Sequence, residues 1–128
     1  MWTHDVSQTE KHYLFVYGTL KRGHCNHYLL EGCPFMGEAE TKEKYALYEA
    51  GIPYVIKEKK ISHIKGEVYE VPRHILKRVD RLEGHPFFYK REKARVILED
   101  GREVEAWMYF WTYEINYAGL NKNGTYGG

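Results

Sequence analysis

A glutamate occupies a position where a sequence selected only for stability would place a cation. Glu83 ends a segment whose apolar residues have helical spacing, and Gly84 follows it. The helix macrodipole is negative at that end and disfavours an acid there by about 0.3–1 kcal/mol. We expect Phe87, Phe88 and Tyr89 to shield the carboxyl from water. Desolvation at a helix end raises the pKa of a carboxyl, which suits general acid–base chemistry near neutral pH.

A glycine turn with two following cations is the second candidate for chemistry. Gly18 comes directly after a β-prone run, and Lys21 and Arg22 follow it. Glycine permits close backbone approach, and successive N–H groups in such a turn can form a concave anion site that would accept a carboxylate. Taken alone, the residues also fit a plain strand-to-loop turn and a solvated glutamate at a helix end.

Strand and helix patterns indicate how these residues are positioned. The continuous apolar run at 13–17 is typical of a strand buried on both faces. A helix begins at Pro72 and ends before Gly84 and Pro86. Its apolar residues are Ile75, Leu76, Val79 and Leu82. A short helix is predicted over 27–31, and strands over 35–40, 45–48, 54–57 and 65–71.

A β-hairpin is predicted over residues 89–111. Its strands are 89–98 and 103–111, and Asp100-Gly101 in the connecting 99–102 segment favours a type I′ turn. The second strand is partly apolar on both faces, which suits a barrel or a sheet covered by helices. The predicted class is α+β, with about six strands in a closed or nearly closed sheet and two helices.

Composition limits the remaining possibilities. A chain of 128 residues, 43% of them hydrophobic, predicts one domain over 1–128 with its own core. A polar extension over 1–12 and an irregular tail over 116–128 are expected. The formal charge of +1 gives no reason to expect nucleic acid as a partner. Without a leader pattern or a long apolar run, no membrane association and a cytoplasmic location are expected, with Cys25 and Cys33 reduced.

Three separated motifs occur in an order that resembles a known family. They are Tyr17-Gly18-Thr19-Leu20-Lys21-Arg22-Gly23 with Asn26-His27, then Gly66-Glu67-Val68-Tyr69, then Asp80-x-x-Glu83-Gly84-x-Pro86-x-x-Tyr89-x-Arg91. Together they resemble the γ-glutamyl cyclotransferase-like family, in particular its γ-glutamylamine cyclotransferase and AIG2-like branch. Tyr109 falls where that family has a tyrosine on its last barrel strand.

The resemblance implies a small mixed barrel flanked by helices, no cofactor and no metal. It implies an enzyme that converts a small-molecule γ-glutamyl amine or amino acid to 5-oxoproline, as the substrate's own α-amino group attacks the γ-carbonyl. Glu83 would transfer protons as general base and then general acid. The backbone of Tyr17, Gly18, Thr19 and Leu20 would hold the α-carboxylate, and Tyr89 and Tyr109 would close the pocket or bind substrate. The released amine and the oligomeric state stay open.

Other functions compete with this interpretation. A non-catalytic binding module could keep the fold and the anion site as a ligand sensor. His24, Cys25, His27 and Cys33 could be gathered into a metal site, although the ligand spacing is poor for zinc. A thiol nucleophile at Cys25 is disfavoured because the implied reaction needs no enzyme nucleophile.

Overall fold

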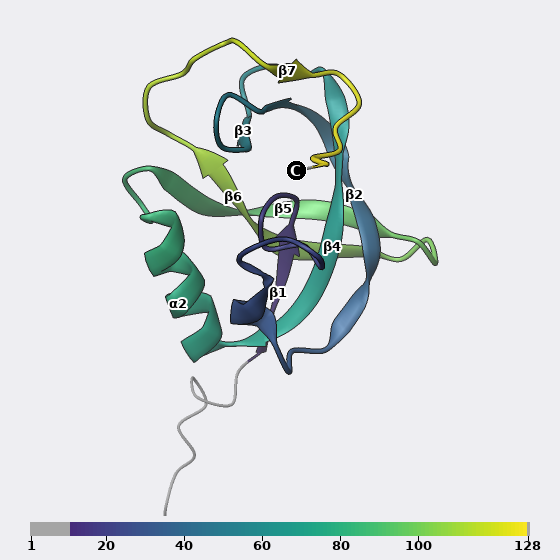
Figure 1. Cartoon of the computed structure of the whole chain (residues 1–128). Coiled ribbons are helices and arrows are strands. Elements are labelled where there is room, and N and C mark those ends of the chain that lie inside the picture. Colours follow the sequence, from purple (N-terminus) through teal and green to yellow (C-terminus); the bar gives the residue numbers. More distant parts are fainter. Residues whose placement is uncertain (1–10, 128) are drawn as a thin grey trace, which may run out of the picture.

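The computed structural model describes residues 11–127. Five strands close into a barrel: β1 (Lys11–Val16), β2 (Phe35–Tyr48), β4 (Ser62–Pro72), β5 (Tyr89–Leu98) and β6 (Glu103–Trp111). Their order is β2-β4-β1-β6-β5, and β5 pairs back to β2 to complete the circle (Figure 1). The β1–β6 pairing is parallel and the others are antiparallel, so the barrel is mixed as predicted.

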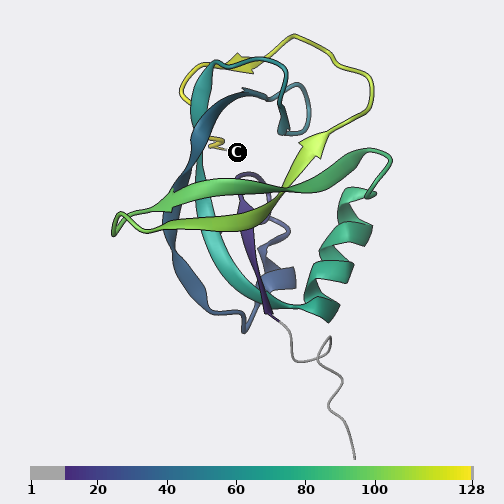
Figure 2. The same cartoon turned by 180° about the vertical axis from the view of Figure 1, so that it is seen from behind.

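The remaining elements lie outside this circle. Two short strands, β3 (Tyr54–Ile56) and β7 (Leu120–Asn121), pair with the end of β2. The 3₁₀ helix η1 (His27–Leu30) and the α-helix α2 (Arg73–Glu83) flank the barrel, as the views from front and back show (Figure 2). The predicted class of an α+β barrel with two helices is confirmed.

The apolar spacing of α2 explains where the helix packs. Ile75, Leu76 and Val79 are buried on one face, while Leu82 is half-exposed at the end of the helix. Pro72 precedes the first turn, where its missing N–H costs nothing. Gly84 ends the helix with a left-handed φ of 67°, a conformation that glycine adopts easily. These ends match the predicted helix.

Strand β2 differs from the prediction. The sequence predicts two separate strands over 35–40 and 45–48, but β2 runs unbroken from Phe35 to Tyr48 with register shifts against β4. The polar residues between them do not break the strand because Thr41 is fully buried, donates to the Glu43 carbonyl and accepts from the Ile64 N–H. The long strand can therefore pair with β3, β4, β5 and β7.

The β5–β6 hairpin has the predicted strand bounds, but its turn is of another type. Type I′ needs positive φ at both central residues, whereas only Gly101 in this turn has one, at 90°. The Gly101 N–H donates to the Leu98 carbonyl, and the Leu98 N–H donates to the Arg102 carbonyl. This pattern is a type I turn closed by a glycine bulge. The Asp100 carboxylate stabilises it by accepting the Arg102 N–H.

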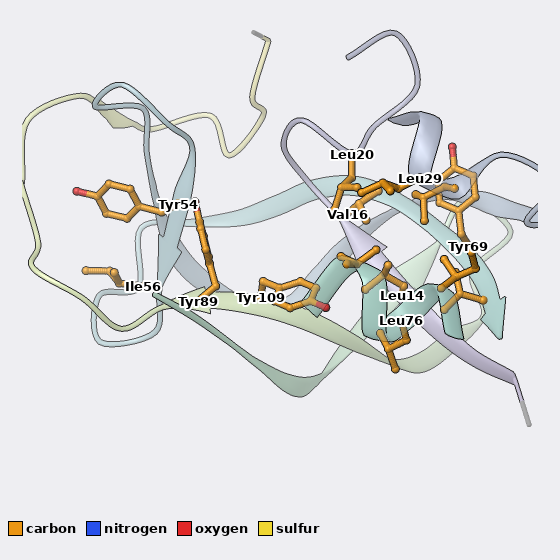
Figure 3. Close-up of a cluster of buried hydrophobic side chains, with 14 of the residues drawn as sticks. Leu14, Val16, Leu20, Leu29, Tyr54, Ile56, Tyr69, Leu76, Tyr89 and Tyr109 are labelled. Carbon is orange, nitrogen blue, oxygen red and sulfur yellow. The ribbon is translucent and has the colours of Figure 1, made fainter. Parts of the chain in front are cut away.

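Two hydrophobic clusters meet at β1, whose alternate side chains enter each of them. Phe15 belongs to one cluster, together with Ile64, Val68, Val96 and Met108. Leu14 belongs to the other cluster, which extends from Leu76 past Tyr109 and Tyr89 to Tyr54 (Figure 3). Burial on both faces explains why β1 reads as an uninterrupted apolar run.

The described part of the tail, residues 116–127, contains one two-residue strand, β7, and is otherwise irregular. Besides strand β7, the Gly124 carbonyl accepts from the Lys65 N–H, and the Tyr126 carbonyl accepts from Lys21 Nζ at 2.7 Å. Of the predicted N-terminal extension, Lys11 and His12 belong to β1 and the rest lies outside the described residues. Among residues 11–127, no helix has the length and apolar character needed to cross a membrane.

Candidate active site

A cavity of about 350 Å³ opens where β1 ends, beside the last residues of α2. Strands β5 and β6 and the segment before β3 supply the rest of its wall. The seven residues that the sequence analysis selects all line it: Tyr17, Gly18, Thr19, Leu20, Glu83, Tyr89 and Tyr109. Residues up to 92 positions apart in the chain therefore share one site.

Glu83 reaches the cavity because α2 ends there. The helix stops at Glu83, and the left-handed Gly84 turns the chain towards β5. A Cβ atom at residue 84 would lie 2.8 Å from Phe88 Cδ2, so glycine is also needed there for space. The helix therefore points its negative end, with the carboxyl, at the cavity.

Burial raises the pKa of the Glu83 carboxyl to about 7. No hydrogen bond or ion pair within residues 11–127 compensates for this burial. The shielding side chains differ from the prediction: Phe87 is 78% exposed, and Phe88 is 48% exposed and does not line the cavity. Tyr89 does line it, together with Tyr17 and Tyr109. A carboxyl with this pKa can both accept and donate a proton near neutrality.

In the turn after β1, the backbone carbonyls of residues 18–20 are bound by the residues that follow the turn. The Gly18 carbonyl accepts from the Lys21 N–H at 3.1 Å, and the Thr19 carbonyl accepts from the Asn26 N–H at 3.0 Å. The Leu20 carbonyl lies 2.9 Å from Nδ1 of His27. Within residues 11–127, the N–H groups of residues 18–20 have no hydrogen-bond acceptor. Three such groups beside a cavity can bind an anion such as a carboxylate.

Gly18 also allows the opposite wall to approach. A Cβ atom at residue 18 would lie 2.9 Å from Pro53 Cγ. Pro53 is itself buried, and its carbonyl accepts the Tyr89 hydroxyl at 2.6 Å. The ring therefore cannot retreat without disturbing the Tyr89 side of the cavity. Space, rather than an unusual φ angle, is what requires glycine at this position.

Gly18→Ala is expected to lower the free energy of unfolding by about 1–3 kcal/mol, the usual range for overpacking a filled site. Urea denaturation followed by tryptophan fluorescence measures the change. Gly127→Ala is the matched control, because a Cβ atom there meets nothing within 4 Å. Equal stability of the two variants would contradict the close packing of Gly18 on Pro53.

The two predicted pocket tyrosines use their hydroxyl protons inside the protein. Tyr89 donates to Pro53, and Tyr109 donates to Asp80 Oδ1 at 2.6 Å. The backbone carbonyl of Tyr109 in turn accepts the Tyr17 hydroxyl at 2.8 Å. Burial is the main cause that raises the pKa of Tyr17, Tyr89 and Tyr109, so all three are neutral walls at physiological pH. The geometry favours pocket closure as the role of Tyr89 and Tyr109.

An ion pair beneath the cavity fixes α2 to the barrel. Arg91 binds Asp80 through Nε at 2.7 Å and Nη2 at 3.1 Å, and its guanidinium lies 4.3 Å from the Trp107 ring centre. Burial alone would raise the pKa of the Asp80 carboxyl, but the bonds from Arg91 and Tyr109 outweigh it and hold that pKa below its usual value. Asp80 is therefore a charged anchor one helical turn before Glu83.

Several cavity residues are not identifiable from the sequence. Cys25, Ile52, Pro53 and Leu82 line it without any motif of their own. Asn26 appears in a motif, but its role of holding the Thr19 side chain at 2.9 Å, through Nδ2, emerges only in three dimensions. Among the described residues, no group of three or more His, Cys, Asp or Glu could hold a metal ion, so His24, Cys25, His27 and Cys33 are not gathered into one site.

Comparisons with known proteins agree on one family. The family described as gamma-glutamyl cyclotransferase, AIG2-like, matches residues 14–127. A Methanocaldococcus jannaschii protein, provisionally named a gamma-glutamylcyclotransferase, is 55% identical over 100 residues, covering 77% of this chain and 83% of its own. A rat gamma-glutamylaminecyclotransferase is 34% identical over 138 residues, covering 88% and 93%. The crystal structure of a mouse AIG2-like protein superposes with a TM-score of 0.79 at 30% identity, covering 91% of this chain and 88% of that one.

Proposed function

The chain belongs to the AIG2-like gamma-glutamyl cyclotransferase family, and we propose that it converts a γ-glutamyl amine or γ-glutamyl amino acid to 5-oxoproline and a free amine. One observation carries the proposal. The same cavity is lined by a carboxyl with a pKa near 7 and by three backbone N–H groups that have no acceptor within residues 11–127. This pairing suits a substrate with a carboxylate to be held and an amino group to be deprotonated.

Binding would fix the glutamyl group before any bond changes. The N–H groups of Gly18, Thr19 and Leu20 hold the α-carboxylate, and the aromatic walls exclude water from the carbon chain. The chain then folds so that the α-nitrogen reaches the γ-carbonyl carbon. Intramolecular attack from a well-held geometry corresponds to effective molarities of about 10⁵–10⁸ M, so positioning supplies much of the acceleration.

Glu83 would then move protons between the two nitrogens. Its carboxylate takes a proton from the α-ammonium, and the freed nitrogen attacks the γ-carbonyl to form a tetrahedral intermediate. The protonated Glu83 donates to the leaving nitrogen as the old C–N bond breaks. The ring nitrogen then loses its second proton to Glu83, which passes it to the released amine, so two protons leave the α-nitrogen and two reach the amine. No water is consumed because the α-nitrogen is the nucleophile. A group with a pKa near 7 fits both directions of transfer.

The test is a product assay with γ-glutamyl amides and γ-glutamyl amino acids. We expect 5-oxoproline and free amine in equal amounts, with no glutamate. A substrate whose α-amino group is acetylated is the matched control and should not react, because its nitrogen can no longer attack. Glutamate as product would indicate hydrolysis instead, and binding of the amides without turnover would favour the ligand sensor.

A further inference from the structure

Within the described part of the chain, no charged side chain lies at the mouth of the cavity. Cys25, Ile52 and Leu82 are the exposed lining residues, and the exposed fractions of Ile52 and Leu82 are 47% and 42%. The deeper lining residues are largely buried, so these three form the rim. Glu83 is the only Asp, Glu, Lys or Arg among the lining residues within 11–127.

Nearby cations are engaged elsewhere or face away. Lys21 Nζ donates to the Tyr126 carbonyl, and Arg22 pairs with Glu67. Arg81 lies two residues before Glu83 on α2, which places it roughly 200° around the helix from the cavity. Burial is the only resolved cause of the raised Glu83 pKa, which agrees with the absence of a neighbouring cation.

The direction of the leaving group follows from the proton transfer. If the proposed function holds, Glu83 must contact the leaving nitrogen, and its neighbour Leu82 stands at the rim beside it. The substituent on that nitrogen therefore extends over Leu82 and Ile52. An alkyl chain would cover their exposed apolar surface, whereas a charged group would lose hydration without gaining a partner.

On the basis of the proposed function, we infer that the preferred substrates are γ-glutamyl amides of uncharged, apolar amines, and that Ile52 and Leu82 determine this preference. An amino-acid leaving group would bring a carboxylate to a rim without cations and close to the Glu83 carboxyl. A diamine would bring an ammonium whose sole carboxylate neighbour in the cavity is the proton-transferring group itself.

Three amides of equal chain length separate these cases: γ-glutamyl-n-butylamide, γ-glutamyl-4-aminobutanoate and the mono-γ-glutamyl amide of 1,4-diaminobutane. Release of 5-oxoproline gives kcat/KM for each. We expect the neutral amide to be preferred over both charged ones by about tenfold or more, because unpaired polar groups at a binding site discriminate strongly. Equal or faster turnover of either charged amide overturns the inference and leaves the proposed function intact.

A substitution at the rim tests whether Ile52 determines the preference for a neutral amine. Ile52→Arg should raise the kcat/KM ratio of the anionic to the neutral amide by about tenfold, since it supplies the missing cation. Ile61→Arg, at a half-exposed position that does not line the cavity, is the control and should leave the ratio unchanged. An unchanged ratio in Ile52→Arg contradicts the assignment of Ile52.

The preference for a neutral amine can also be measured by binding if no amide is turned over. In that case the proposed function fails, and calorimetric dissociation constants for the same three amides measure the preference directly. Tighter binding of the neutral amide supports the apolar rim, and equal or tighter binding of a charged one overturns it.

Discussion

Glu83→Gln is expected to lower kcat for 5-oxoproline release by about 10²–10⁴-fold, the usual contribution of a general acid–base group. Glutamine has nearly the same shape but cannot exchange a proton under these conditions. The KM should change little because the backbone N–H groups of residues 18–20 stay in place. Glu31→Gln, which alters an exposed glutamate after η1, is the control and should keep full activity.

The pH dependence of kcat provides an independent check. In the proposed reaction Glu83 must start as the carboxylate, so the rate should rise with pH through an apparent pKa near 7, the value to which burial raises this group. The residual activity of Glu83→Gln should lack that ionisation. A wild-type rate that is flat between pH 5.5 and about 8.5 would falsify the assignment of Glu83 as the proton-transferring group.

The same substitution should stabilise the protein at high pH. Glu83 has an unfolded pKa near 4.5 and a folded pKa near 7, so between these values the unfolded state loses its proton first. Wild-type stability therefore falls as pH rises across this window and is constant above it. Glu83→Gln removes the penalty of up to about 3 kcal/mol. Urea unfolding should separate the two proteins at pH 8 and bring them together at pH 4.

Asp80→Ala is expected to lower the free energy of unfolding by about 3 kcal/mol, because it leaves Arg91 without its partner in a largely buried setting. The exposed fractions of the two side chains are 13% for Arg91 and 11% for Asp80. The substitution also frees the Tyr109 hydroxyl, which donates to Asp80. Activity should fall as well, since Tyr109 and Glu83 lose a common support.

A second aspartate–arginine pair provides a matched control for Asp80. Arg102 Nε donates to Asp100 at 2.7 Å, the same distance as Arg91 Nε to Asp80, but both side chains of the hairpin pair are more than half exposed. Solvent screens such pairs, so Asp100→Ala should cost much less than Asp80→Ala. Equal losses in urea unfolding would mean that burial does not strengthen the Asp80 anchor.

The sequence predicts the elements that are marked by their own residues, such as end residues, apolar spacing and turn residues. Helix α2 is marked by Pro72, its apolar spacing and Gly84, and the β5–β6 hairpin by two long alternating runs around Asp100-Gly101. The sequence predicts two strands in place of β2 because residues 41–44 are polar, and only the strands that pair with β2 show why these residues stay in the sheet. The turn type was wrong because the Asp-Gly pair also fits a type I turn with a glycine bulge.

The residues of the proposed site that belong to sequence motifs were predictable, whereas those that reach the cavity only through packing were not. Glu83 stands out because its helix end disfavours an acid. The sequence does not indicate that Ile52 and Leu82 line a cavity, since an exposed apolar residue becomes informative only when a cavity is seen beside it. The hydrogen bond from the Tyr89 hydroxyl to the Pro53 carbonyl joins residues 36 positions apart, which no local pattern reveals. Shielding by Phe87 and Phe88 was wrong because the chain turns at Gly84 and carries those rings outward.

The position of β1 between β4 and β6 affects when the cavity can form during synthesis of the chain. β1 is made first among the barrel strands, yet it borders β4 and β6, and Tyr17 is held by Tyr109 across 92 residues. While the chain leaves the ribosome, the wall of the cavity around the turn at 17–20 stays incomplete until Tyr109 of β6 has emerged. Such distant pairing slows folding, so we expect the candidate cavity to be among the last parts of the domain to form.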